Sequence, residues 1–207
     1  MREADLQAKL AAFSSWDPIN YGIIESNLQV HKETGIDLGP SSDESDFGGD
    51  EALLSLDRTY RKEKQMAEAA AAYIHENPDL KLMYVQFDLP DSGGHSKGYN
   101  TSKQLKTIGQ TDSNTGIILE AIDHAGLLEE SLIIFISDHG GGGVDPKSHG
   151  SDHRMDKTIF WGCSNTGWLN APHLPPDFVI TDTAALAVHA LGLEAPEAWE
   201  AKLPARM

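Results

Sequence analysis

Short apolar runs alternate along the chain with longer segments in which apolar residues recur every three or four positions. Residues 81–87 predict an apolar strand. Residues 131–136 are a nearly continuous apolar run rich in isoleucine, which is typical of a strand buried on both faces of a sheet. Residues 158–161 predict a further strand, and residues 13–24 predict a short strand and a turn. Residues 1–13 form a charged amphipathic stretch and predict a helix.

The longer segments predict further helices. Residues 51–76 carry apolar side chains at helical spacing, and Pro78 predicts the end of this helix. Residues 103–125 predict a helix that closes near Gly126, and residues 181–191 predict a C-terminal helix. Because helices and strands alternate, the chain predicts an α/β domain with a mostly parallel sheet.

One segment lacks both patterns. Residues 35–49 are rich in Gly, Ser and Asp and poor in large apolar side chains, and this composition predicts a surface loop. The chain has 207 residues, enough for one domain with a full core, and shows no internal repeat. We therefore expect residues 1–207 to form a single domain.

Composition excludes several classes of function. With 32 acidic and 16 basic residues the net charge is -16, which repels nucleic acid and anionic membrane surfaces. The chain has no apolar run of about 18 residues, so we expect no membrane insertion. The single cysteine, Cys163, excludes an internal disulfide framework and a cysteine-rich metal site, and is expected in the core rather than as a nucleophile. The cellular compartment stays open.

Candidate metal ligands gather just after the predicted strands. Asp91 and His95 follow the first long apolar run, with two glycines between them. Asp138 and His139 follow the second run, and His149 comes after a four-glycine stretch. Carboxylate and imidazole are ligands that zinc and similar divalent ions use, and open α/β folds bind their substrates at the carboxyl edge of the sheet. The sequence therefore predicts a shared metal site at that edge.

Some of these residues have other interpretations. A histidine near a strand end is more often a hydrogen-bonded structural residue than a ligand. His153, four residues past His149, is the alternative third ligand to Asp91 and His95. Lys97 is either a phosphate contact or a solvated loop residue.

Three segments carry a resemblance to a known family. Residues 84–98, 132–140 and 149–150 resemble the alkaline phosphatase superfamily, most closely its type I phosphodiesterase and nucleotide pyrophosphatase branch. The resemblance runs from about Trp16 to Leu203. It implies a three-layer α/β sandwich with a central, mostly parallel sheet.

The resemblance also implies roles for the candidate ligands. Asp91, His95 and His149 would hold one ion, and Asp138 and His139 would hold the other, with the ions about 4 Å apart. The implied ions are zinc, with manganese as the alternative. The implied activity is hydrolysis of a small phosphodiester or phosphomonoester through a covalent phospho-enzyme on a Ser or Thr nucleophile.

The chain departs from the family in two ways. The family's nucleophile and a further metal-binding Asp lie upstream of the matching segment, so we expect this chain to be the C-terminal part of a domain that lacks its first strands. Ser14 and Ser15 are early hydroxyls in the wrong context. An exposed sheet edge would favour an oligomer. The loop from His139 to His149 is shorter than in many nucleotide pyrophosphatases, so a preference for nucleotide substrates stays open.

Two functions are alternatives to the predicted hydrolase. The chain is either a catalytically incomplete metal-binding module, or a sulfatase or phosphotransferase relative of the same superfamily.

Overall fold

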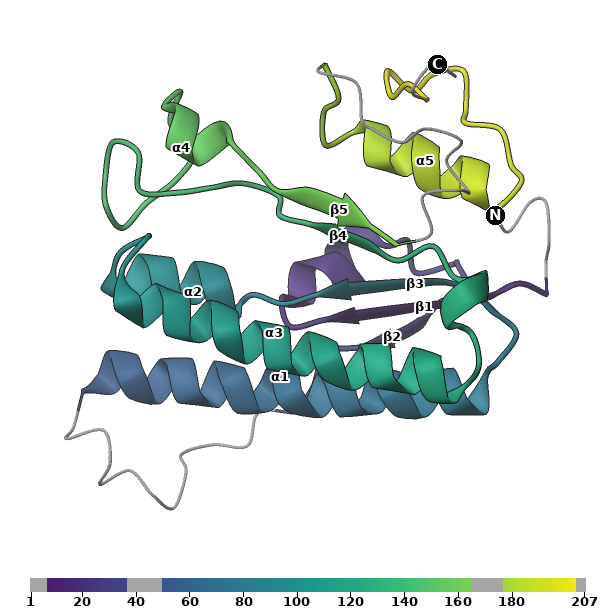
Figure 1. The fold of residues 1–207 in the computed structure, drawn as a ribbon, viewed down its shortest axis with the longest axis horizontal. Coiled ribbons are helices and arrows are strands. Elements are labelled where there is room, and N and C mark those ends of the chain that lie inside the picture. The colour runs from purple at the N-terminus through teal and green to yellow at the C-terminus, as the bar shows by residue number, and fades with distance from the viewer. Residues whose placement is uncertain (1–6, 37–49, 165–176, 204–207) are drawn as a thin grey trace. The chain divides into compact units, whose positions relative to one another are not determined.

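The computed structural model describes residues 7–36, 50–164 and 177–203 (Figure 1). The described residues group into two compact units. The larger unit comprises residues 9–128 and 139–158, and the smaller unit takes in residues 129–138 and 159–203.

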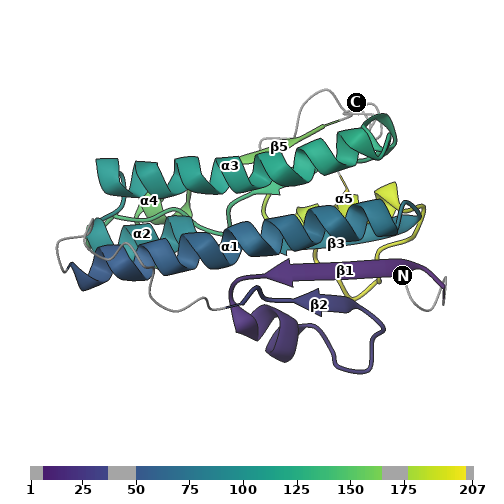
Figure 2. The same ribbon diagram turned by 90° about the horizontal axis from the view of Figure 1, so that it is seen from below.

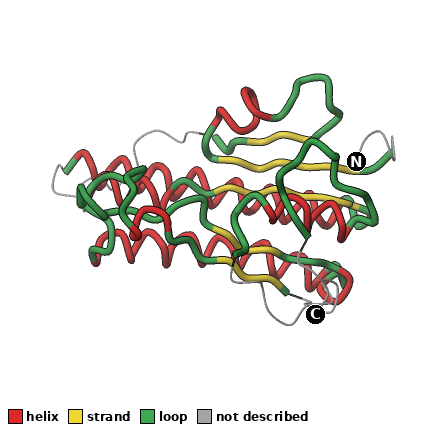
Figure 3. Tube along the Cα trace, turned by 90° about the horizontal axis from the view of Figure 1, so that it is seen from above, coloured by secondary structure: helices red, strands yellow, loops and turns green. Residues whose placement is uncertain are grey.

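The larger unit is built on a three-stranded parallel sheet. Its strands are β1 (Lys9–Ser14), β2 (His31–Glu33) and β3 (Leu80–Gln86), in the order β2-β1-β3 (Figures 2 and 3). Phe13 lies opposite Glu33 on one side and Val85 on the other. The strand predicted at 81–87 is confirmed with its bounds shifted by one residue.

The helix predicted for residues 1–13 is wrong where the structure describes it. Residues 9–13 belong to β1, the central strand of the sheet. Leu10 and every later residue of this strand are buried, because β1 has a neighbour on each side. A strand in that position needs no alternation of polar and apolar residues, so the local pattern did not identify it.

The helices of the larger unit follow the sequence closely. They are η1 (Ile19–Ile23, a π-helix), α1 (Glu51–Glu76), α2 (Leu89–Lys97), α3 (Ser102–His124) and α4 (Arg154–Lys157). The predictions for α1 and α3 are confirmed, α1 with the same bounds. The side chain of Asp50 starts α1 by accepting hydrogen bonds from the amides of Ala52 and Leu53, as N-cap residues do.

Helices α1 and α3 pack side by side against one face of the sheet (Figure 2). The core between them is made of small and medium apolar side chains from β1, α1 and α3: Ala11, Phe13, Met66, Ala67, Ala70, Ile74, Ile118 and Ala121. Alanines on the inner face of α1 leave room for the ring of Phe13, which is fully buried. This packing fixes α1 relative to β1.

The direction of the strands decides where the candidate site lies. The arrows of β1 and β3 point toward the end of the unit at which α1 and α3 begin (Figure 1). Helix α2 starts at Leu89, three residues after β3 ends at Gln86. The carboxyl edge of the parallel sheet therefore leads directly into α2.

The smaller unit contains β4 (Ile134–Ile136), β5 (Trp161–Cys163) and α5 (Asp182–Ala190), preceded by the 3-10 turn η3 (Leu128–Glu130) at the boundary. β4 and β5 are antiparallel, so the described strands are mostly but not wholly parallel. The strand expected at 131–136 is shorter than predicted, and Phe135 is 38% exposed rather than buried. The strand expected at 158–161 begins only at Trp161, whose indole donates to the Thr183 hydroxyl at 3.0 Å.

The remaining expectations concern the C-terminal helix, the surface loop, membrane-spanning helices and the number of layers. The predicted C-terminal helix is confirmed as α5, and Gly192 follows it with a φ of +70°. Most of the predicted surface loop, residues 37–49, lies outside the described residues. Within the part of the chain that the structure describes, no helix is long and apolar enough to cross a membrane. A second helix layer, which would complete three layers, stays a prediction.

Candidate metal centre

Helix α2 carries the first pair of candidate ligands. Asp91 and His95 are one helical turn apart, so both side chains lie on the same face of the helix. The Nε2 atom of His95 is 3.3 Å from Oδ2 of Asp91. Pro90 sits in the first turn, where its missing amide hydrogen costs nothing. The whole segment from Leu89 to Lys97 is helical.

The two glycines between these ligands serve packing. A Cβ atom at Gly93 would overlap the side chain of Thr107 on α3, and one at Gly94 would overlap the ring of Tyr99. Both glycines are buried. Gly93 allows α2 to lie close to α3, and Gly94 leaves room for the ring of Tyr99.

The glycine loop, residues 140–151, brings the other histidines to α2. Nε2 of His149 lies 3.7 Å from Oδ1 of Asp91, and Nε2 of His139 lies 3.8 Å from the same oxygen. The two imidazole rings stack with their centroids 3.7 Å apart. One ligand atom each from Asp91, His95 and His149 lie within 4.8 Å of one another, close enough to hold a single ion.

Backbone contacts orient the imidazoles. Nδ1 of His95 lies 2.8 Å from the carbonyl oxygen of Lys147, and Nδ1 of His139 lies 2.8 Å from the carbonyl oxygen of Gly140. A carbonyl only accepts, so in both contacts the Nδ1 atom donates. The Nε2 atom of each ring faces Asp91. This is the usual arrangement of metal-bound histidines, in which the outer nitrogen donates to a carbonyl or carboxylate.

Tyr99 is a site residue that sequence reasoning missed. Its hydroxyl donates a hydrogen bond to Oδ1 of Asp91. Its amide donates to the carbonyl of Pro146 at 2.8 Å, which joins the end of α2 to the glycine loop. Within that loop, a Cβ atom at Gly142 would come within 2.9 Å of the Tyr99 side chain. The Tyr99 hydroxyl thus contacts the same Asp91 oxygen that His139 and His149 approach.

Asp156 is a second residue that was missed. Its buried carboxylate accepts from the amide of Gly143 at 2.8 Å, and from the amide and hydroxyl of Ser151 at 3.0 and 2.6 Å. These bonds, with the Ser151 hydroxyl as the main cause, lower the pKa of Asp156. The side chain of Asp156 thus joins Gly143, within the glycine loop, to Ser151 at its end.

The structure separates the candidates for the third ligand. His153 uses Nδ1 to accept from the amide of Met155 at 3.2 Å and caps α4. His149 is the histidine that lies beside Asp91. Asp138 belongs to the smaller unit, directly before His139, so its pairing with His139 around a second ion stays a prediction.

The remaining candidates have structural partners. Lys97 donates to the Asp50 carboxylate at 2.6 Å and joins the end of α2 to the start of α1. Ser14 donates to the side chain of Gln86 at 2.8 Å, and Ser15 donates to Glu63 at 2.8 Å. That neither serine is the nucleophile stays a prediction.

An open groove of about 460 Å³ lies between the start of α1 and α2. It is lined by small polar and carboxylate side chains with two apolar ones: Ala52, Ser55, Leu56, Asp88, Asp91, Ser92, His95 and Ser96. Because Asp91 and His95 form part of its wall, a ligand in this groove would touch the candidate metal centre.

Carboxylate and imidazole side chains beyond the carboxyl ends of parallel strands are typical of metal-dependent α/β enzymes. The family described as type I phosphodiesterase / nucleotide pyrophosphatase matches residues 11–174, which is most of the chain. The chain belongs to this family, as the resemblance of its motifs predicted.

Two curated relatives share a shorter segment. The mouse and rat proteins named ectonucleotide pyrophosphatase/phosphodiesterase family member 1 are 35% and 33% identical to this chain over 66 residues. That segment is 32% of this chain and 7% of each relative.

A solved structure shares the fold. Phosphoglycerate mutase from Leishmania mexicana, crystallised at low cobalt concentration, matches 95% of this chain and 37% of its own, with a TM-score of 0.53. At 14% sequence identity this likeness shows the α/β fold alone.

Proposed function

We propose that this chain forms part of a metal-dependent phosphodiester hydrolase with a dinuclear, zinc-type centre. The observation that carries the proposal is the convergence of Asp91, His95 and His149 at the carboxyl edge of the sheet. Membership of a phosphodiesterase and nucleotide pyrophosphatase family supports the reaction class. The substrate would be a small phosphate ester.

The donor set fits a zinc-like ion. It offers one carboxylate and two imidazoles, the mixture of oxygen and nitrogen ligands found in catalytic zinc sites. The carbonyl of Lys147 orients His95, and the Tyr99 hydroxyl orients Asp91. Asp138 and His139 are proposed for the second ion, and manganese is the alternative metal.

An ion bound there would polarise a phosphoryl oxygen and stabilise the charge of the departing alkoxide. The chain's own part in the reaction is to hold the ligands and to shape the groove beside Asp91 and His95. No nucleophile is assigned among the described residues. Residues 1–207 are proposed to act as one partial alkaline-phosphatase-like domain.

The test compares histidine variants that differ only in their place around Asp91. Zinc and manganese affinities of the dialysed protein are measured by competition with a chromogenic chelator, together with hydrolysis of bis-p-nitrophenyl phosphate. We expect His149→Ala to weaken zinc binding by at least about tenfold. His153→Ala, the matched control, should bind zinc like the unmodified chain. Equal loss in the two variants would contradict the ligand assignment.

A non-catalytic metal-binding module is the second candidate. It is favoured by the fact that the described part of the larger unit assembles one ligand triad. It predicts about one zinc ion per chain and no phosphodiester hydrolysis, whereas the first proposal predicts two ions and turnover.

A further inference from the structure

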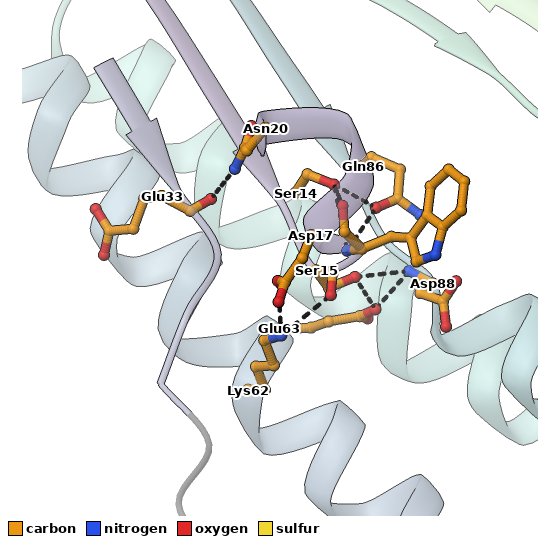
Figure 4. A network of polar contacts seen from close by, with 10 residues as sticks. Ser14, Ser15, Asp17, Asn20, Glu33, Lys62, Glu63, Gln86 and Asp88 are labelled. Carbon is orange, nitrogen blue, oxygen red and sulfur yellow. Dashed lines mark hydrogen bonds and ion pairs between the residues drawn. The ribbon is translucent and has the colours of Figure 1, made fainter. Parts of the chain in front are cut away.

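A buried carboxylate from α1 reaches the start of α2. Glu63 lies in the middle of α1 and its side chain is fully buried. Its Oε1 atom accepts hydrogen bonds from the amide of Asp88 at 2.5 Å and from the Ser15 hydroxyl at 2.8 Å (Figure 4). The same atom accepts from the amide of Leu89 at 2.8 Å. One oxygen thus joins α1, the end of β1 and the beginning of α2.

These contacts supply hydrogen-bond acceptors at the N-terminus of α2, where the N-cap residue makes no side-chain capping bond. The first amides of a helix have no partner within the helix, and the residue before it usually supplies one. Asp88 occupies that position in α2 but makes no capping bond, because its carboxylate accepts from the Ser92 hydroxyl at 2.7 Å. Glu63, which is distant in sequence, supplies the acceptor in its place. Asp91 follows two residues after Leu89 on the same helix.

We propose that Glu63 is a positioning residue for the candidate metal centre, and that its hydrogen bonds to the first amides of α2 set where Asp91 and His95 stand. The inference rests on the proposed function, since it takes these two residues as ligands. Glu63 itself stays away from the ion and acts through the helix.

A packing role alone does not account for a carboxylate at this point. The neighbouring buried positions of α1 are apolar, among them Met66, Ala67 and Ala70. Burial raises the pKa of Glu63 to about 7, and its Oε2 atom has no hydrogen-bond partner among the described residues. An apolar residue would avoid the cost of burying this group. Unlike an apolar side chain, Glu63 can accept hydrogen bonds from the first amides of α2.

The test uses two variants of similar size at one position. Glu63→Gln keeps an oxygen that accepts from the amides, whereas Glu63→Met fills the same space without an acceptor. Zinc affinity is measured by chelator competition, and the cobalt-substituted protein is examined by its visible absorption spectrum. We expect Glu63→Gln to stay within about threefold of the unmodified chain, and Glu63→Met to bind zinc about tenfold or more weakly, with an altered cobalt spectrum.

Met66→Ala is the matched control, because it removes buried volume from the same helix, within a core cluster of buried residues from β1, α1 and α3. It should lower the thermal midpoint and leave zinc affinity unchanged. If Glu63→Met binds zinc like the unmodified chain, Glu63 has a structural role only and the inference is overturned while the metal site stands. If the unmodified chain itself binds no zinc, the proposed function fails and the inference falls with it.

Discussion

At the scale of the residue, Asp91 is the side chain on which the candidate centre converges. It accepts from Tyr99 and lies within 4 Å of three imidazole nitrogens, from His95, His139 and His149. Asp91 is proposed as a ligand, and it is also the side chain at which α2 and the segment from His139 to His149 come together. The geometry of the centre therefore depends on groups that orient Asp91 without touching an ion.

Removing one of these groups tests that dependence. Tyr99→Phe keeps the ring that packs against Gly94 and Gly141 and deletes the hydroxyl that donates to Asp91. We expect zinc affinity, measured by chelator competition, to fall by about tenfold. Tyr21→Phe, at a position that is 71% exposed, is the control and should have no effect.

Glu63 makes the stability depend on pH. Its pKa is about 7 in the folded chain against 4.5 for the free side chain, because burial disfavours the charged form. The folded state then binds more protons than the unfolded state between these values. The free energy of unfolding should therefore fall as the pH rises from about 4.5 to 7, by about 3 kcal/mol from this group, and level off above.

Urea unfolding of the metal-free protein at pH 5 and pH 8 measures this effect. Glu63→Gln cannot titrate, so the difference between the two proteins isolates the contribution of Glu63 from that of neighbours such as Asp88 and Lys62. Identical pH dependence in the two proteins would show that Glu63 titrates normally.

At the scale of the element, α2 and the glycine loop are each held by hydrogen bonds to one carboxylate, Glu63 for α2 and Asp156 for the loop. Helix α2 packs on α3 through Gly93 and is capped by Glu63. The glycine loop is bonded to the Asp156 carboxylate at Gly143 and at Ser151. Because these two segments carry the candidate ligands, a change that moves either one should affect metal binding.

The packing of α2 on α3 can be tested with a pair of glycine substitutions. Gly93→Ala places a Cβ atom against Thr107 and should destabilise the fold by about 1–3 kcal/mol in urea unfolding. Gly116→Ala, on α3, meets no atom within 4 Å and should stabilise the helix by up to about 1 kcal/mol. Opposite signs for the two variants are expected, and a neutral Gly93→Ala would contradict the close approach.

The tie at Asp156 can be tested by replacing its carboxylate. Asp156→Asn keeps one oxygen for the Gly143 amide but presents an amide group where Ser151 needs an acceptor. We expect faster hydrogen exchange at the Ser151 amide and zinc binding weakened by about tenfold. Asp152→Asn, which alters an exposed ion pair with Lys157, is the control.

At the scale of the whole molecule, the net charge of -16 favours binding of a cation. A ligand that binds the folded chain and not the unfolded chain raises its stability with concentration. Zinc at about 100 times its dissociation constant should stabilise the chain by about 2.7 kcal/mol, seen as a higher thermal midpoint that EDTA reverses. The same addition to His149→Ala should give a smaller rise.

Local signals in the sequence were enough for much of the fold. The apolar spacing in residues 51–76 and the stop at Pro78 predict α1 with the bounds that the structure shows. The sequence also identified Asp91, His95 and His149 as candidate metal ligands, because carboxylate and imidazole side chains beside glycines after an apolar run form a local pattern.

The tertiary structure alone decided the rest. Residues 9–13 became a central strand because β2 and β3 flank them, which no local pattern indicates. Tyr99, Asp156 and Glu63 orient the candidate centre through hydrogen bonds to groups that folding brings near, and none has a neighbouring sequence signal. The sequence determined which side chains can bind a metal. The fold decided which of them meet, because their distances depend on how α1, α2 and the glycine loop pack together.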